Sequence, residues 1–243
     1  MSELLRAENV HKSYRNGAEA VSVLRGIDLR LRAGQIGVIL GPSGVGKSTL
    51  LHILGLLDTM DEGRLVYDGR DVSGLSERER DRLRNAEFGF IFQFFHLLPD
   101  LTTLENVMLP GMIACRPLVW MRARVKWRRR AEEMLERVGL AHRLKHRPAQ
   151  LSGGEKQRVA IARALVSEPR IVFCDEPTGN LDTASARSVR ALLWELNREW
   201  KQTLLIVTHN VEFTEGAHWV GRLADGKLQL ERTSPDMSGL TAE

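Results

Sequence analysis

Short apolar segments of strand length recur along the chain. They are QIGVIL (35–40), RLVYD (64–68), FGFIF (88–92), RIVFCD (170–175) and TLLIVTH (203–209). Several are apolar on both faces, which is typical of strands buried in a mostly parallel sheet. Helical patterns follow at 46–57 and 183–200. This alternation of strands and helices predicts an α/β fold with helices on both faces of the sheet.

The pattern changes between about residues 93 and 166, where strand signals disappear and helical ones dominate. The helical stretches there are TTLENVMLPGMI, VKWRRRAEEMLERVGL and LSGGEKQRVAIARAL. We therefore expect a single domain over 1–243, with an α/β core over about 1–92 and 167–232 and an inserted helical subdomain over about 93–166. Residues 233–243 are polar and small, and we expect a frayed tail there.

Composition narrows the class of protein only modestly. Of 243 residues, 43% are hydrophobic and 27% charged, which is ordinary for a soluble globular protein. The net charge of +4 is a weak indication of nucleic-acid binding, because 31 acidic residues are mixed among 35 basic ones. Cys115 and Cys174 form no disulfide framework and suit a reducing cytosol. No apolar run approaches the ~18 residues that span a bilayer, and the first residues lack the apolar core of a secretory signal. We expect a cytosolic protein unless a partner holds it to a membrane.

One glycine-rich segment carries the strongest chemical signal. GPSGVGKS (41–48) fits the phosphate-loop pattern G-x-x-x-x-G-K-[ST], follows a predicted strand and opens a predicted helix. The glycines let backbone N–H groups surround phosphate oxygens. Lys47 would reach the β- and γ-phosphates, and the Ser48 hydroxyl would ligate Mg²⁺. The alternative, a plain glycine-rich turn before a helix, does not account for the Lys–Ser pair.

Two carboxylates end another predicted strand. IVFCDEPT (171–178) places Asp175 and Glu176 at a carboxyl end, where open α/β sheets bind ligands. Asp175 suits Mg²⁺ contact, and Glu176 suits a general base that polarises the attacking water. A solvated strand end is the alternative. His209 and Gln93 also follow predicted strands, but each alone would indicate little.

LSGGEKQRVAIARAL (151–165) starts a helix with three small residues. Ser152 alone could cap the helix, so the two glycines that follow it need another reason. A helix start with open backbone N–H groups suits an anion.

Taken in order, these motifs resemble the ATP-binding cassette (ABC) ATPases over nearly the whole chain. The motifs are GPSGVGKS at 41–48, Gln93, LSGGEKQ at 151–157, Asp175 with Glu176, GNLD at 179–182 and His209. The resemblance implies a P-loop NTPase core of the α/β class with a mostly parallel sheet, an antiparallel β edge and an inserted helical subdomain. It implies an ATPase with ATP and Mg²⁺ as cofactors.

The resemblance also implies a role for each motif residue. The catalytic residues would be Glu176, His209, Gln93 and Lys47, and the metal-contacting residues Ser48, Gln93 and Asp175. The nucleotide-contacting residues would be Tyr14, Gly41, Pro42, Ser43, Gly44, Val45, Gly46, Lys47, Ser48, Thr49, Ser152, Gly153, Gly154 and Asp182. Tyr14 would stack on adenine, although an ordinary surface tyrosine on a strand is the alternative.

In the ABC family, the signature helix binds the γ-phosphate of ATP held by a second subunit. Ser152, Gly153 and Gly154 are therefore expected to be exposed, and the chain to form a head-to-tail homodimer around two ATP molecules. Gln93 would couple the helical subdomain to the nucleotide, and Asp182 would link the two sites. Three positions depart mildly from the family pattern: Gly37, Cys174 and Asn210.

FQFFHLLPDLTTLENVMLP (92–110) resembles the lipoprotein-releasing ATPases of the LolD type, and exporters of the MacB type and cell-division ATPases of the FtsE type share much of it. This likeness implies integral membrane permease subunits as partners and a place on the cytoplasmic face of the inner or plasma membrane. Exposed apolar residues usually mark an interaction site, and we expect four of them to seat the membrane subunit. These are Phe94, Phe95, Leu97 and Leu98.

The stretch CRPLVWMRARVKWRRR (115–130) departs from that subgroup. It holds seven basic residues without an acid: Arg116, Arg122, Arg124, Lys126, Arg128, Arg129 and Arg130. Trp120 and Trp127 lie seven apart, on one helical face. A solvated helix face with two packed tryptophans is the simpler interpretation, and contact with anionic lipid headgroups is the other.

Two other function classes fit less well. A soluble ABC ATPase acting on nucleic acid or ribosomes would carry coiled coils, a zinc module or a second cassette, so no nucleic-acid partner is expected. A P-loop kinase offers no reason for LSGGEKQ or for Glu176 after Asp175.

Overall fold

The structure is a computed structural model that describes residues 2–16 and 19–233. Apart from Thr233, the expected tail lies outside these residues. The chain divides into two compact units, unit 1 with residues 1–77 and 197–243, and unit 2 with residues 78–196.

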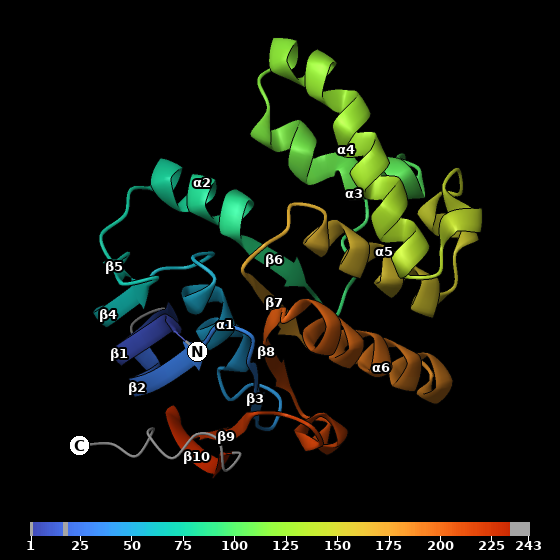
Figure 1. Cartoon of the computed structure of the whole chain (residues 1–243). Coiled ribbons are helices and arrows are strands. Elements are labelled where there is room, and N and C mark those ends of the chain that lie inside the picture. Colours follow the sequence, from blue (N-terminus) through green and yellow to red (C-terminus); the bar gives the residue numbers. More distant parts are fainter. Residues whose placement is uncertain (1, 17–18, 234–243) are drawn as a thin grey trace. The chain divides into compact units, whose positions relative to one another are not determined.

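Unit 1 contains an antiparallel sheet with the strand order β2-β1-β4-β5 (Figure 1). The strands are β1 (Glu3–Asn16), β2 (Glu19–Arg32), β4 (Glu62–Tyr67) and β5 (Arg70–Asp71). The predicted antiparallel edge is thus present, and it is longer than the segment 64–68 suggested. Leu4, Leu5, Ala7 and Val10 of β1 are buried.

Unit 1 also contains strands in the order β10-β9-β3-β8. They are β3 (Ile36–Leu40), β8 (Thr203–Thr208), β9 (Trp219–Ala224) and β10 (Lys227–Thr233). β3 pairs in parallel with both β8 and β9, and every residue of β3 and β8 is buried. The doubly apolar segments 35–40 and 203–209 are therefore central parallel strands, as predicted. Helix α1 (Lys47–Leu54) and the short 3₁₀ helix η3 (Val211–Thr214) complete the unit.

Gly37 departs from the family pattern because a tryptophan occupies the space of its missing side chain. Gly37 pairs with Trp219 of β9, and a Cβ on Gly37 would lie 2.2 Å from the Trp219 ring. Trp219 is 1% exposed. A larger residue at position 37 would displace this buried ring.

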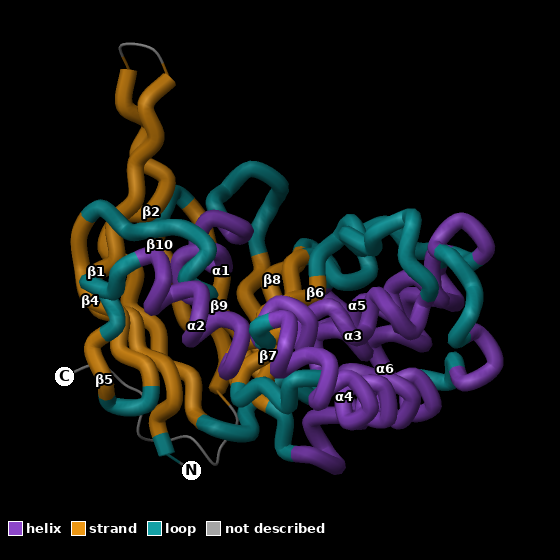
Figure 2. Tube along the Cα trace, turned by 90° about the horizontal axis from the view of Figure 1, so that it is seen from above, coloured by secondary structure: helices purple, strands orange, loops and turns teal. Residues whose placement is uncertain are grey.

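Unit 2 combines a pair of parallel strands with a group of helices, as Figure 2 shows from above. The strands are β6 (Phe88–Ile91) and β7 (Ile171–Asp175). The helices are α2 (Glu77–Glu87), α3 (Thr103–Ala114), α4 (Pro117–Arg137), α5 (Gly153–Leu165) and α6 (Thr183–Trp200), with 3₁₀ turns η1 (Ala141–Arg143) and η2 (Pro148–Gln150). Helices α3, α4 and α5 pack on one another, and α5 crosses β6.

Unit 2 is larger than the helical subdomain expected over about 93–166. It also contains β6, β7 and most of α6, which the sequence pattern assigned to the α/β core. The narrower boundaries of the helical subdomain stay a prediction. Within residues 2–16 and 19–233, no helix combines the length and the apolar character needed to cross a membrane.

Candidate functional site

The glycine-rich segment 41–48 forms the loop between β3 and α1 in unit 1. Lys47, only 6% exposed, points back into this loop. Its Nζ donates hydrogen bonds to the carbonyl oxygens of Gly41 and Pro42, each at 2.9 Å. Pro42, Ser43 and Gly44 are exposed. The loop therefore encloses the lysine ammonium and turns its own tip to solvent.

Gly46 precedes α1 with a left-handed backbone, at φ 102°. A side chain there would be strained, and its Cβ would lie 2.7 Å from Val23 Cγ1. No side chain caps this helix start. A glycine-rich loop that leads into a helix start is the arrangement that binds phosphate at helix N-termini.

Tyr14 of β1 lies beside this helix. Its hydroxyl donates a 2.6 Å hydrogen bond to Asp58 Oδ2 and also interacts with the Thr49 hydroxyl. Lys12 Nζ lies 5.1 Å from the ring centroid and 3.2 Å from Asp58 Oδ1. Partial burial and the hydrogen bond to Asp58 raise the pKa of Tyr14. The ring is held at its hydroxyl end and remains 42% exposed.

His209 follows β8, the strand next to the one that precedes the loop. Leu40 of β3 pairs with Thr208 of β8, so Gly41 and His209 both follow paired residues at one edge of the sheet. Asn210, which replaces the commoner aspartate, accepts a 2.9 Å hydrogen bond from the Glu212 N–H and caps η3. Unit 1 therefore brings together the phosphate loop, Tyr14 and His209.

In unit 2, Asp175 and Glu176 end β7 as predicted. Both are half-buried, and Glu176 has a positive φ of 45°. A non-glycine residue in this region is uncommon, and such strain gathers at functional sites. The Gly179 N–H donates to the Glu176 carbonyl at 3.0 Å, which closes a turn directly after the carboxylate pair.

Gln93 is linked to the GNLD segment by two reciprocal hydrogen bonds. Gln93 Nε2 donates to Asn180 Oδ1 at 3.2 Å, and Asn180 Nδ2 donates to the Gln93 carbonyl at 3.1 Å. Gly179 lies under the glutamine side chain, since a Cβ there would be 3.0 Å from Gln93 Nε2. The sequence pattern did not single out Asn180 as a partner of Gln93.

The signature helix α5 begins with a capping box. Ser152 Oγ accepts from the Glu155 N–H at 3.2 Å, and Glu155 Oε2 accepts from the Ser152 N–H at 2.8 Å. The spacing S-x-x-E is a recognised signal for this arrangement. The Ser152 hydrogen bonds lower the pKa of Glu155.

The expectation that all three small residues are exposed is wrong for Gly154. Ser152 is exposed and Gly153 half-exposed, but Gly154 is buried. A Cβ on Gly154 would lie 2.8 Å from Ser185 Oγ, and this hydroxyl donates to Asp182 Oδ2 at 2.6 Å. Gly154 is therefore small because the start of α6 packs against it.

Gln157, the last residue of LSGGEKQ, joins three motifs. It is fully buried, and its Nε2 donates to the Pro177 carbonyl at 2.6 Å and to the Phe92 carbonyl at 3.3 Å. Unit 2 thereby brings together Gln93, the strand end at Glu176, the signature helix and the GNLD turn. Its place within the motif was the signal that could have identified Gln157.

The candidate metal-contacting residues all offer oxygen atoms. These are the Ser48 hydroxyl, the Gln93 amide and the Asp175 carboxylate. Across residues 2–16 and 19–233, no cluster of three histidine, cysteine or acidic residues could hold a metal. Mg²⁺ normally uses one or two protein oxygens together with water and substrate phosphate, rather than an all-protein cage. Ser48 belongs to unit 1 and Gln93 and Asp175 to unit 2, and each of them supplies the oxygen type of ligand that Mg²⁺ prefers.

Comparison with known proteins decides the family. The family model described as "ABC transporter" matches residues 24–179. The chain belongs to the ABC transporter family. As a member, it is an ATP-binding cassette ATPase of the α/β class.

Individual ABC relatives match almost their entire length. The lipoprotein-releasing system ATP-binding protein LolD of Hahella chejuensis is 51% identical, covering 86% of this chain and 88% of the relative. The LolD protein of Bdellovibrio bacteriovorus is 48% identical, covering 93% of this chain and 100% of the relative. A dimeric ATP-binding cassette solved in a post-hydrolysis state with ADP and Pi has a TM-score of 0.85 and 38% identity, covering 95% of this chain and 99% of that one.

Proposed function

We propose that this ABC cassette binds and hydrolyses ATP to power a membrane complex of the lipoprotein-releasing type. The observation that carries the proposal is the presence of both halves of a nucleotide site in one chain. Unit 1 presents a phosphate loop closed around Lys47, and unit 2 presents a signature helix beside the Glu176 turn. The names of the LolD relatives support the lipoprotein-releasing type.

In this proposal, each motif has one chemical task. The loop N–H groups and Lys47 bind the phosphates, and Tyr14 stacks on the adenine. Glu176 accepts a proton from the attacking water, and His209 contacts the γ-phosphate. Gln93 reports nucleotide occupancy through its hydrogen bonds to the GNLD turn.

Ser48, Gln93 and Asp175 would hold Mg²⁺. The ion supplies charge neutralisation on the β- and γ-phosphates when it is bound. The protein residues would position the phosphate oxygens.

The signature helix would serve a second copy of the chain. Ser152 and Gly153 stay accessible at its start, although the capping box already satisfies Ser152 within its own chain. The Ser152 N–H is already bonded to Glu155 Oε2, so an anion arriving from another molecule would meet the helix start at the accessible Gly153. A head-to-tail homodimer meets this need, and the dimeric solved relative supports it.

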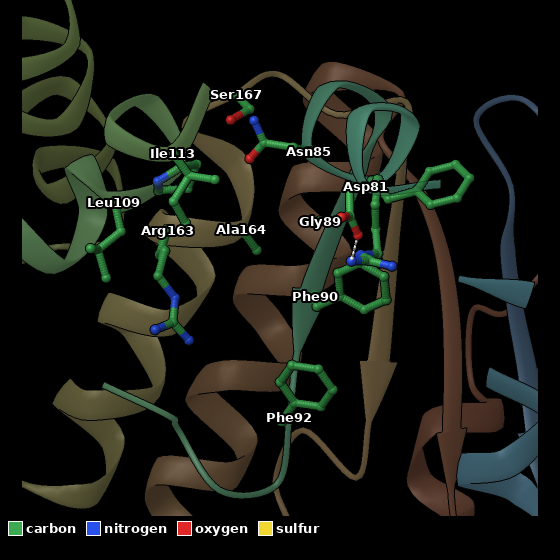
Figure 3. Close-up of a pocket in the computed structure, with 13 residues that line it drawn as sticks. Asp81, Asn85, Gly89, Phe90, Phe92, Leu109, Ile113, Arg163, Ala164 and Ser167 are labelled. Atoms are coloured by element: carbon green, nitrogen blue, oxygen red, sulfur yellow. Dashed lines mark hydrogen bonds and ion pairs between the residues drawn. The ribbon is translucent and has the colours of Figure 1, made fainter. Parts of the chain in front are cut away.

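A cavity of about 540 Å³ in unit 2 suits a segment of the membrane subunit (Figure 3). It is lined by Asp81, Arg84, Asn85, Phe88, Gly89, Phe90, Phe92, Leu109, Pro110, Ile113, Arg163, Ala164 and Ser167. Aromatic and aliphatic side chains form much of this surface, and the paired Asp81 and Arg84 add charge. An amphipathic helix fits a groove of this kind.

The loop after Gln93 adjoins Arg163, one of the residues lining this cavity. The Arg163 guanidinium donates to the carbonyls of Phe95 at 2.8 Å and His96 at 2.5 Å. Phe94 and Leu98 are 65% and 47% exposed, whereas Phe95 and Leu97 are half-buried. Phe94 and Leu98 are therefore the better docking candidates among the four that the sequence suggested.

The docking proposal is tested by recovery of the membrane subunit. Ile113→Asp and Leu98→Asp should each lower its recovery from detergent-solubilised membranes about tenfold or more, because a charge would be buried in an apolar interface. Basal ATPase activity should stay at the wild-type level. Leu230→Asp is the matched control, since Leu230 is 52% exposed in unit 1.

If Ile113→Asp and Leu98→Asp recovered as much membrane subunit as Leu230→Asp, the docking proposal would be wrong. Recovery of nucleic acid in place of a membrane-spanning protein would overturn the transporter assignment itself.

A further inference from the structure

One face of α4 packs against other helices, and the opposite face exposes apolar side chains to solvent. A Cβ on Gly111 of α3 would lie 2.2 Å from the Trp127 ring, so this tryptophan fills the space above the glycine. Ala131 and Leu135 are fully buried on the same side. These contacts hold α4 against the other helices and fix which side turns outward.

The outward side of the first half of α4 is a narrow apolar strip. Leu118, Met121 and Val125 are 79%, 73% and 77% exposed. Their spacing of three and four residues places them on one face of the helix. The first half of α4 lies away from β6 and β7 (Figure 1).

Basic side chains flank the strip on both sides. At 100° per residue, Arg124 and Arg128 fall on one side of the strip, and Arg122, Lys126 and Arg129 on the other. No acidic residue occurs between Glu105 and Glu132. We refer to Leu118, Met121 and Val125 with these five basic residues as the basic–apolar face.

Part of this positive charge is unneutralised. Arg128 and Arg129 pair with Glu132 and Glu133, at 2.9 and 3.1 Å. Within the part of the chain that the structure describes, Arg122 and Lys126 form no ion pair with any acidic residue. A second copy would place like charges opposite them, which disfavours self-association through this face.

We propose that the basic–apolar face binds an anionic phospholipid surface. An apolar strip flanked by arginine and lysine is the pattern of a helix that lies in the plane of a membrane interface. The strip would enter the headgroup boundary, and the long basic side chains would extend to lipid phosphates. This binding goes beyond the proposed ATPase cycle and does not depend on it.

The test measures co-sedimentation of the purified full-length protein with lipid vesicles. One vesicle contains phosphatidylcholine with 30% phosphatidylglycerol (a composition of about one anionic lipid in three), and the other contains phosphatidylcholine alone. Wild-type protein should bind the anionic vesicle at least tenfold more tightly, and binding should weaken as salt rises. Arg122→Gln with Lys126→Gln should weaken it about 25-fold, at about fivefold per charge.

A second variant tests the apolar strip. Leu118→Gln, Met121→Gln and Val125→Gln together should lower binding about tenfold or more at constant charge, because glutamine keeps the helix but removes the buried apolar area. Arg78→Gln with Arg82→Gln is the matched control, since these exposed arginines also lie four apart, on α2. Thermal unfolding and basal ATPase activity should be unchanged in all variants.

Equal binding to both vesicles would overturn the proposal, as would equal losses in the α2 control. A second outcome would also overturn the proposal. If wild-type protein bound neither vesicle, but needed Arg122 and Lys126 to recover a solubilised membrane subunit, the basic–apolar face would bind a protein.

Discussion

Tyr14 is held by contacts that suit a base-stacking role. Asp58 fixes its hydroxyl, Lys12 lies over part of the ring, and Thr49 connects it to the helix after the phosphate loop. Burial opposes ionisation of Asp58, but hydrogen bonds from Tyr14, the Thr59 N–H and Lys12 outweigh it and lower the pKa of Asp58. The ring is therefore positioned before any nucleotide arrives.

Replacing Tyr14 tests this role. Tyr14→Leu should weaken ATP binding about tenfold or more, because stacking on a base contributes roughly 1–3 kcal/mol. Tyr14→Phe keeps the ring and loses only the hydrogen bond to Asp58, so its affinity should stay within about threefold of wild type. Titration with a fluorescent ATP analogue measures both. A Tyr14→Leu affinity equal to that of wild type would leave Tyr14 as an ordinary surface residue.

Residue-level chemistry could be predicted where a motif has a fixed local spacing. The phosphate loop and the Asp175–Glu176 pair were placed correctly at strand ends because both signals lie within eight residues. The partners of Asp58, Asn180 and Gln157 could not be predicted in this way, although Gln157 stands within the signature motif. Their partners lie 20 to 87 positions away along the chain, and only the folded structure brings them together.

At the scale of elements, the strands that could be predicted from the sequence are those that are buried on both faces. Strands β3, β7 and β8 are buried at every position except Asp175, and their central residues are apolar, so their sequences stand out. The register of β1 against β2 shifts at four places, which interrupts the alternation that would reveal the hairpin. Helix α2 has no buried residue and thus no apolar stripe to detect.

The start of α5 shows one helix end serving two purposes. Its capping box stabilises the helix within the chain, and in the proposed dimer the same turn would face the γ-phosphate of the second copy. The Glu155 carboxylate also pairs with Arg143 at 2.9 Å. Its pKa lies below the ordinary 4.5, so its stabilising contribution is complete above that pH and is lost as pH falls through the lowered pKa.

Glu155→Gln tests this pH dependence. Glutamine keeps an acceptor for the Ser152 N–H but removes the negative charge. The variant should therefore lower the free energy of unfolding by about 0.5–1 kcal/mol at pH 7, a typical value for a charge at a helix N-terminus. The difference from wild type should shrink as the pH falls through the lowered pKa of Glu155, because the wild-type carboxylate is then protonated. Urea unfolding above and below this pKa measures it. Glu133→Gln, at an exposed ion pair, should change stability by less than about 0.5 kcal/mol throughout, and a Glu155→Gln difference that is constant with pH would contradict the account.

At the scale of the whole molecule, the order of motifs along the chain predicted the family, and the ABC transporter match confirmed it. The division into two units was not predictable in the same way. It depends on contacts such as α5 against β6, where a Cβ on Gly89 would lie 2.5 Å from the Ala164 carbonyl. No local sequence pattern indicates which helices will pack against the β6–β7 pair.

The central claim is that ATP joins two copies of this chain and that Glu176 then drives hydrolysis. The most direct test is the molar mass of Glu176→Gln in saturating ATP and Mg²⁺, measured by light scattering. Hydrolysis should be slowed about 100-fold or more, so the ATP-bound dimer should accumulate. Its molar mass should be twice the 27.4 kDa of one chain. Adding Ser152→Arg should return the mass to one chain while ATP binding at Lys47 persists. A Glu176→Gln variant that stays monomeric in ATP, or a Ser152→Arg variant that still dimerises, would contradict the account.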